Sequence, residues 1–331
     1  MTRAGPIGIG GVGGSGTRVV AELVRALGTD LGTDLNGPLD NLSFTLLFKR
    51  PHRFGHTGGL VDPDDAVAMA AARTFEAVMT HGGVTPARLA HVARAVVDVG
   101  LHRVRGDVFE PHDRDAARVR TSIALGRARH ALAAMASHQP PAPVAWGFKE
   151  PNSFVFLPVL FEHFAGLRYV HVVRNGLDMA YGANDAQVRN WSHLYGLRPG
   201  SGPELSATDR LRYWARANTA AADFLDGRPS GLVLRYEDVT GDAPGALGRL
   251  CEALSIEPSD EAVALAGRLR PSASSGRHRL HDHDALLDAC GPEAERALAR
   301  FGYLPEPSPR PNSDQPRYDP GGHRGGVGGG E

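Results

Sequence analysis

The stretch GIGGVGGSGTR, residues 8–18, decides the fold of this chain. A short β-prone run at 6–9 leads into it, and residues 19–28 (VVAELVRALG) follow with apolar side chains at helical spacing. A strand, a glycine-rich turn and a helix in this order predict the first unit of an α/β fold. Glycines let consecutive backbone N–H groups converge on an anion, and the helix adds the positive end of its dipole. The stretch therefore predicts an anion-binding turn.

Three functional interpretations of this turn compete with that of an ordinary flexible loop. Residues 8–13 match the dinucleotide pattern G-x-G-x-x-G, but a segment so rich in glycine matches by chance. A Walker A loop needs a lysine before its Ser or Thr, and this stretch contains none, which argues against a nucleotide kinase. The favoured interpretation is a phosphate cradle with backbone donors, two hydroxyls and an arginine. Its predicted ligands are Gly13, Gly14, Ser15, Gly16, Thr17 and Arg18.

The remaining pattern extends the α/β prediction along the chain. Predicted strands are residues 44–48 (FTLLF), 144–148, 168–173 (RYVHVV) and 231–236 (GLVLRY), and predicted helices are 154–164, a segment after Asn175, 205–225 and 244–254. Strands separated by helices predict a P-loop-like parallel sheet flanked by helices. Residues 62–137 are rich in Ala and Arg and predict a helical insertion of about three helices. One α/β domain over 1–304 is expected, with a disordered Pro/Gly-rich tail at 305–331.

Composition limits the partners. The 331 residues are 42% hydrophobic and carry a net charge of −1, so no global charge favours nucleic acid. Two cysteines without metal-ligand spacing, and no apolar leader or bilayer-length segment, predict a cytoplasmic protein without a membrane span. Only two of the 36 basic residues are lysines, Lys49 and Lys149. Each lysine is therefore worth inspecting.

Polar side chains follow three of the predicted strands. Arg174 comes directly after 168–173, where ligands of open α/β sheets bind. Lys149, in WGFKEP (146–151), and Tyr236, in RYEDV (235–239), also lie at strand ends. A lone arginine at such a position is more often part of a surface salt bridge, so the prediction rests on several segments together.

Together these segments resemble the sulfotransferases that use 3′-phosphoadenosine 5′-phosphosulfate (PAPS), in particular bacterial members. The 5′-phosphosulfate loop of that family is matched at 14–18, its 3′-phosphate segment VVRDxxDxAxS at 172–180, its RYEDL segment at 235–239, and its lysine-bearing strand end at 146–151. Order and spacing agree over most of 5–305. The resemblance implies transfer of a sulfuryl group from PAPS to a hydroxyl or amine acceptor, with adenosine 3′,5′-bisphosphate as product and no metal required.

The chain departs from the family pattern at two places. Gly14 stands where relatives carry Lys or Arg, so Arg18 or Lys149 would supply that charge. Gly182 stands where the second 3′-phosphate ligand, a serine, is expected, so Asn184 or Arg277 would replace it. The resemblance also assigns Gly276 and Arg277, in SSGR (274–277), to the 3′-phosphate, and the ring of Tyr236 to the adenine.

Sulfuryl transfer needs cations for the developing charge and a base for the proton of the acceptor. Arg18 and Lys149 are the predicted cations, Asp40 and then Glu150 the predicted bases, and His52 a third candidate. A cluster of histidines at 278–283 followed by Asp284 is a weak metal candidate, because its spacing fits no ligand pair; Asp284 is instead expected to cap a helix at 285–287.

The acceptor is expected to be a small molecule, a glycan or a lipid. Two alternatives remain open at this point. One is a P-loop nucleotide kinase. The other is a non-catalytic nucleotide-binding relative, which the two departures at Gly14 and Gly182 make credible.

Overall fold

A computed structural model describes residues 5–55, 58–101, 116–137 and 145–304. The predicted tail at 305–331 and part of the predicted insertion lie outside the described residues. The helices are α1 Thr17–Ala26, α2 Leu42–Phe48, α3 Ala66–Met79, α4 Pro86–Leu101, α5 Ala116–Ala136, α6 Leu157–His163, α7 Gly176–Ala180, α8 Ala186–Trp191, α9 Ala207–Leu225, α10 Tyr236–Gly241, α11 Ala243–Leu254, α12 Asp260–Ala266, α13 His283–Cys290 and α14 Pro292–Arg300. Short 3₁₀ turns lie at Pro51–Arg53, Pro151–Phe156, Ser192–Tyr195 and Arg277–Leu280.

A parallel sheet of four strands forms the centre, which confirms the predicted fold class. The strands are β1 Ile7–Gly11, β2 Gly147–Lys149, β3 Arg168–Val173 and β4 Gly231–Arg235, in the order β2-β1-β3-β4. The carboxyl ends of parallel strands meet at one edge of a sheet. This order therefore brings the residues that follow β2, β3 and β4 to the same edge as the glycine turn after β1.

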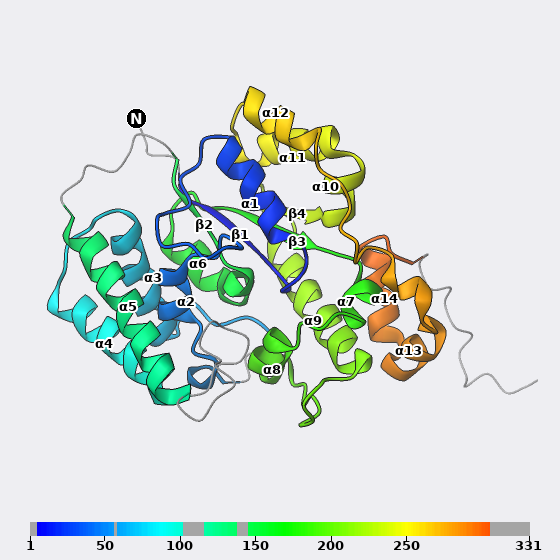
Figure 1. The fold of residues 1–331 in the computed structure, drawn as a ribbon, viewed down its shortest axis with the longest axis horizontal. Helices are drawn as coiled ribbons and strands as arrows, with labels where there is room; N and C mark the ends of the chain where they lie inside the picture. The colour runs from blue at the N-terminus through cyan, green and yellow to red at the C-terminus, as the bar shows by residue number, and fades with distance from the viewer. Residues whose placement is uncertain (1–4, 56–57, 102–115, 138–144, 305–331) are drawn as a thin grey trace, which may run out of the picture.

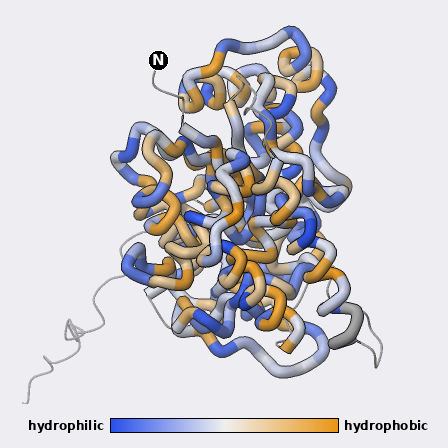
Figure 2. Tube along the Cα trace, turned by 90° about the vertical axis from the view of Figure 1, so that its left-hand side faces the viewer, coloured by the Kyte–Doolittle hydropathy of each residue, from blue (hydrophilic) through white to orange (hydrophobic). Residues whose placement is uncertain are grey.

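Helices cover both faces of the sheet (Figure 1). Helices α1, α11 and α12 pack on one face, where Ile9 and Val172 belong to the same buried cluster as the apolar side of α1. Helices α6 and α9 pack on the other face with the aromatic cluster around Phe148. Along the helices the trace alternates between hydrophobic and hydrophilic residues (Figure 2), as expected for helices that bury one side only.

The chain between α1 and α2 covers the outer edge of β2. The amide of Asp30 donates to Ala145 O (3.0 Å), and the amide of Gly147 donates to Asp30 O (2.7 Å). The amide of Asn41 donates to Lys149 O (2.7 Å). Backbone groups at this edge are thereby paired without a further strand.

Helices α3, α4 and α5 gather with α2 at one end of the molecule (Figure 1). The prediction of a helical insertion is confirmed for its described residues. The alanines on the inner sides of these helices allow close approach to α2 and to the phenylalanines of the core.

The strand predicted at 44–48 is wrong, because this segment is helix α2. Asn41 caps the helix by accepting a hydrogen bond from the amide of Phe44 (3.0 Å). Phe44 and Phe48, four residues apart, stack with their ring centroids 4.1 Å apart on one face. A continuous apolar run does not distinguish a buried strand from a buried helix, and the cap decided the outcome.

Two boundaries also need correction. The segment predicted as one helix at 154–164 begins as the 3₁₀ turn Pro151–Phe156, which Glu150 caps, and becomes helical only at Leu157. The predicted cap Asp284 lies inside α13, and Asp282 caps that helix instead by accepting from the amide of Ala285. None of the helices in the described ranges is long and apolar enough to cross a bilayer.

Candidate functional site

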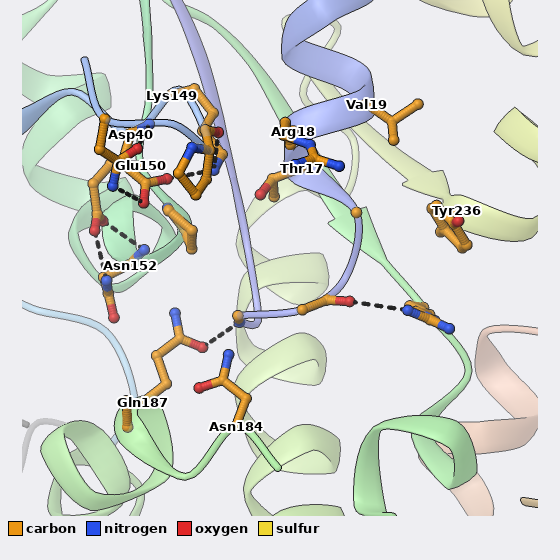
Figure 3. A pocket seen from close by; sticks show the side chains of 18 of the residues that line it. Thr17, Arg18, Val19, Asp40, Lys149, Glu150, Asn152, Asn184, Gln187 and Tyr236 are labelled. Atoms are coloured by element: carbon orange, nitrogen blue, oxygen red, sulfur yellow. Dashed lines mark hydrogen bonds and ion pairs between the residues drawn. The ribbon is translucent and has the colours of Figure 1, made fainter. Parts of the chain in front are cut away.

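A cavity of about 530 Å³ opens at the carboxyl edge of the sheet, beside the glycine turn (Figure 3). It brings together predicted residues that are far apart in the sequence. The predicted residues that line it are Gly13, Gly14, Gly16, Thr17, Arg18, Asp40, Lys149, Glu150, Arg174, Asn184 and Tyr236. Ser15, His52, Gly182, Gly276 and Arg277 are not among its lining residues.

The glycine turn presents backbone amides to this cavity. The amides of Gly16, Thr17 and Arg18 make no hydrogen bond to any other described residue, as expected at the start of α1. Gly16 has φ +93°, and a Cβ there would lie 2.2 Å from Cδ2 of Tyr236. The ring of Tyr236 therefore packs directly on the turn. Only glycine fits at position 16, because both the backbone conformation and the ring exclude a side chain.

Gln187, in the cavity wall, holds the glycine turn by two hydrogen bonds. The amide of Gly13 donates to Gln187 Oε1 (2.5 Å), and Gln187 Nε2 donates to Gly11 O (3.4 Å). The sequence analysis missed Gln187, and no local signal could have found it, because the contact joins residues 174 positions apart. Ser15 is buried, and its Oγ finds no partner within the described part of the chain. This hydroxyl lies behind the turn beside Gly11 and not in the cavity wall.

Arg174 lies between the glycine turn and a serine-rich segment. Its side chain is only 8% exposed. Nη1 donates to Gly14 O (3.4 Å), and the guanidinium lies 4.9 Å from the ring centroid of Tyr236. Nη2 donates to three hydroxyls, those of Ser274 (2.9 Å), Ser272 (3.2 Å) and Ser275 (3.3 Å). Among the described residues no carboxylate forms an ion pair with Arg174, and its Nε has no partner.

The serine-rich segment is held in place by Asp178 of α7. Its carboxylate accepts from the amides of Gly276 (2.7 Å) and His278 (3.1 Å) and contacts Nδ1 of the His278 ring (2.7 Å). Burial would raise the pKa of Asp178, but these hydrogen bonds from His278 and Gly276 outweigh burial and lower it. We call residues 272–278 the serine strap.

Arg277 of the strap lies next to Gly182. Its Nη1 donates to Tyr181 O (3.2 Å) and its Nε to Ser274 O (3.1 Å). A Cβ on Gly182 would lie 3.5 Å from Nη1 of Arg277. The arginine thus occupies the space beside the position where the family pattern has a serine.

The second cation of the cavity is Lys149, at the end of β2. Its side chain is 2% exposed, and Nζ contacts Asp40 and donates to Pro38 O (3.1 Å). Asp40 also accepts from Asn36 Nδ2 (2.9 Å). The carboxylate of Glu150 accepts from the amide and Nδ2 of Asn152 (2.6 and 2.7 Å). Figure 3 shows Lys149, Asp40 and Glu150 on one side of the turn and Tyr236 on the other.

Arg18 and His52 occupy peripheral positions. The side chain of Arg18 is 60% exposed at the mouth of the cavity, and its Nε lies 3.7 Å from Glu22. His52 lies 3.9 Å from Asp98, away from the cavity wall. Among the described residues no cluster of His, Cys, Asp or Glu has the arrangement of a metal site; His278, from the weak candidate cluster, is bonded to Asp178.

A second buried arginine, Arg50, follows the end of α2 and is not among the lining residues of the cavity. Its Nη1 donates to Asp98 of α4 (3.2 Å), and its Nη2 lies 3.2 Å from Nε2 of His91. Arg53 Nε also donates to Asp98 (2.9 Å). Burial would raise the pKa of Asp98, but hydrogen bonds and charges from Arg53 and Arg50 outweigh it and lower the pKa. Lys49, directly before Arg50, lines the cavity.

Comparison with known proteins identifies the family of the chain. No curated protein matches the chain. Among solved structures, the sulfotransferase domain from the curacin biosynthetic pathway is 15% identical, with a TM-score of 0.43 over 91% of this chain and 98% of that domain. The sulfotransferase domain from the olefin synthase of Synechococcus PCC 7002 is also 15% identical, with a TM-score of 0.43 over 92% and 97%. Sulfotransferase STF9 from Mycobacterium avium is 13% identical, with a TM-score of 0.41 over 91% and 76%.

The decisive match is to a family model. Residues 6–260 match the model described as "Sulfotransferase family", and this range includes the glycine turn, Lys149, Arg174 and Tyr236. The matched range covers well over half of the chain. The sequence resemblance is thereby confirmed: this chain belongs to the sulfotransferase family.

Proposed function

We propose that the cavity binds PAPS and that the protein transfers its sulfuryl group to a hydroxyl or amine of a small-molecule, glycan or lipid acceptor. The observation that carries the proposal is Arg174. A buried guanidinium costs several kcal/mol of desolvation unless an anion or strong acceptors surround it. Arg174 contacts only hydroxyls, a carbonyl and a ring among the described residues. Its charge is therefore available to an anionic ligand.

The cavity residues fit a nucleotide with anionic groups at both ends. Free amides at the start of α1 suit a phosphosulfate group, as do the hydroxyl of Thr17 and the guanidinium of Arg18. Arg174, with the hydroxyls of Ser272 and Ser274, suits the 3′-phosphate. The ring of Tyr236 lies between the two groups. Gly276 and Arg277 support the strap in this proposal and do not touch the nucleotide.

Three residues on the other side of the turn suit the transfer step. PAPS supplies the activated sulfuryl group. Lys149 stabilises negative charge that develops on the transferred group, and Asp40 accepts the proton of the acceptor. The contact between Lys149 and Asp40 holds the cation and the base together. Glu150 is the weaker candidate for the base, because both of its oxygens accept hydrogen bonds from Asn152.

Thermal stabilisation separates this proposal from the alternatives. Adenosine 3′,5′-bisphosphate should raise the melting temperature of the full chain, whereas ATP with Mg²⁺ and NAD should not. Stabilisation by ATP with Mg²⁺ alone would favour a nucleotide kinase. Binding of the bisphosphate without transfer of ³⁵S from labelled PAPS to any acceptor of a cell extract would favour a non-catalytic relative. A cytoplasmic location is part of the same proposal.

A further inference from the structure

We propose that the side-chain amide of Asn184 donates a hydrogen bond to the sulfuryl group while that group is transferred. This inference rests on the proposed function, and it assigns to the reaction a further residue that touches the reacting group. From the sequence, Asn184 was expected only as a substitute ligand of the 3′-phosphate. Its place beside the glycine turn indicates a different role.

Four carboxamide side chains line the cavity, and their hydrogen bonds set Asn184 apart. The four belong to Asn36, Asn152, Asn184 and Gln187. In three of them both the oxygen and the nitrogen are engaged, by Asp40 for Asn36, by Glu150 and Trp191 for Asn152, and by Gly13 and Gly11 for Gln187. Within the described ranges, the amide of Asn184 bonds to no other residue. Its two N–H donors are therefore available to a ligand.

Asn184 lies directly beside the glycine turn. A Cβ on Gly13 would lie 2.8 Å from Nδ2 of Asn184, and a Cβ on Gly14 would lie 3.9 Å from it. Figure 3 shows the side chains of Asn184 and Gln187 next to each other on this side of the turn. The two glycines carry no side chain, and Gln187 already accepts from the Gly13 amide. Asn184 therefore supplies the side-chain donor that this part of the turn lacks.

The position of Asn184 along the cavity favours the transferred group over the two phosphates. The free amides at the start of α1 suit the 5′-phosphate, and Arg174 suits the 3′-phosphate. No hydrogen bond joins Asn184 to Arg174 or to the serine strap in the described part of the chain. Helix α8, which follows Asn184, is joined to the side of Lys149, because Trp191 Nε1 donates to Asn152 Oδ1 (2.8 Å). A sulfuryl group directed from the turn towards Lys149 is thus the part of PAPS that this donor suits.

The backbone at Asn184 is anchored, which suits a donor that must be in place before the reaction. The carboxylate of Asp185, the next residue, accepts from Arg210 Nε (2.7 Å) and from the amide of Leu205 (2.9 Å). A preorganised donor stabilises developing charge without reorganising at the moment of reaction. Asn184 can therefore contribute to the rate although its side chain is exposed in the cavity wall.

The proposed donor complements the two charged residues of the transfer step. Sulfur forms a bond to the acceptor oxygen or nitrogen while its bond to the bridging oxygen of PAPS breaks. The bridging oxygen keeps the electron pair, and Asp40 takes the proton of the acceptor. Lys149 and the Asn184 amide stabilise the oxygens of the sulfuryl group during this exchange. Because an amide does not titrate, the contribution of Asn184 should be the same at every pH at which the protein is folded.

The test measures the initial rate of ³⁵S transfer by the full-length chain from saturating labelled PAPS to acceptors in an extract of the cells that naturally produce the protein. Asn184→Ala should lower this rate about ten- to a hundredfold, as for loss of one hydrogen bond to a charged group. The shape of the pH profile should not change. Asn184→Lys, which places a cation at the same point, should transfer at least about fivefold faster than Asn184→Ala.

Two controls separate a role in transfer from a role in binding or folding. The dissociation constant of adenosine 3′,5′-bisphosphate, which lacks the sulfuryl group, should differ less than about twofold between Asn184→Ala and the natural chain. This value also reports that the variant folds. Glu204→Gln, which alters an exposed side chain outside the cavity wall on the segment after α8, should transfer as the natural chain does.

The possible outcomes distinguish this inference from the proposed function. An unchanged rate in Asn184→Ala would overturn the inference and leave the proposed function standing. Bisphosphate binding that weakens by the same factor as the rate would also overturn it, because Asn184 would then be a ligand of a phosphate. Absence of label with the natural chain would overturn the proposed function, and the inference with it.

Discussion

Arg50 and Arg174 are both buried arginines, and their partners differ. Arg50, 2% exposed, pairs with the carboxylate of Asp98. Arg174, 8% exposed, is surrounded by serine hydroxyls, a carbonyl and a tyrosine ring. Neutral partners orient a guanidinium without neutralising it, whereas a carboxylate does both. The first arrangement suits a structural cation and the second a cation that meets a ligand.

The two regions also differ in how they are built. The Asp98 cluster joins α2 to α4 of the insertion and contains charges of both signs. The Arg174 region consists of the glycine turn and the serine strap, and the strap is held by Asp178, the phenol oxygen of Tyr236 and hydrogen bonds of Arg277. Substitutions in the first region should therefore affect stability, and substitutions in the second should affect binding. Four experiments test this division.

The largest effect is expected for Asp98→Asn. Removal of the carboxylate leaves the charges of Arg50 and Arg53 without their counter-ion, which should cost about 3–5 kcal/mol of unfolding free energy. Urea unfolding measures the change. Asp223→Asn, which removes an exposed partner of Arg300, is the matched control and should cost less than about 1 kcal/mol. Equal costs for the two variants would show that the cluster is not structural.

Acid should destabilise the protein through two buried histidines, His91 beside Arg50 and His171 in β3. Burial lowers the pKa of His171, in β3, to about 4; burial and then the charge of Arg50 lower the pKa of His91 to about 4. The unfolded chain binds these protons near pH 6.5, so stability is complete above that pH and falls as the pH drops toward 4. Each histidine should contribute about 3 kcal/mol to this loss. His171→Asn should unfold with a flatter pH dependence than the natural chain, and an unchanged slope would contradict the assignment.

Arg174→Met should impair binding while sparing the fold. Loss of a buried, charge-assisted contact should weaken adenosine 3′,5′-bisphosphate about a hundredfold, or about 2.7 kcal/mol, as isothermal titration calorimetry would show. The unfolding free energy should change by less than about 1 kcal/mol, because no carboxylate loses its partner. Arg300→Met, at the surface, should leave binding unchanged. A large loss of unfolding free energy in Arg174→Met would show that Arg174, like Arg50, stabilises the fold.

The smallest effect is expected for Tyr236→Phe. The phenol oxygen accepts from the amide of Ser272 (3.0 Å) and joins the strap to the glycine turn. Its removal leaves the ring on Gly16 and should cost about 1 kcal/mol of bisphosphate binding, a few-fold in the dissociation constant. Binding that is insensitive to this change would mean that the strap is positioned by Asp178 alone.

Much of the fold followed from local patterns in the sequence. The β3 strand at 168–173 was predicted to the residue, because Tyr169 and three valines in six residues favour a strand and no cap competes. Helix α2 was missed, since its character depends on the side chain of Asn41 and on packing against Phe75 and Phe148. Burial on all sides hides the periodicity that would identify a helix.

Residues of the candidate site could be predicted where they belong to a recognisable sequence motif, and not where they are held only by long-range contacts. Gly16, Arg174 and Tyr236, which line the cavity, lie in the glycine turn and at strand ends, in segments that resemble the family pattern. Gln187 contacts the glycine turn across 174 positions of the sequence, and Asp98 contacts Arg50 across 48. No local sequence pattern predicts contacts at such separations.

The covered edge of β2 has a consequence for self-association. An open strand edge is a template on which other chains can add, and a slip by one residue would turn Lys149 to the opposite face of the sheet. Because Asp30 and Asn41 already occupy that edge, the short strand can neither shift nor recruit a foreign strand. The backbone hydrogen bonds that position Lys149 in the cavity therefore also prevent strand addition at this edge of the sheet.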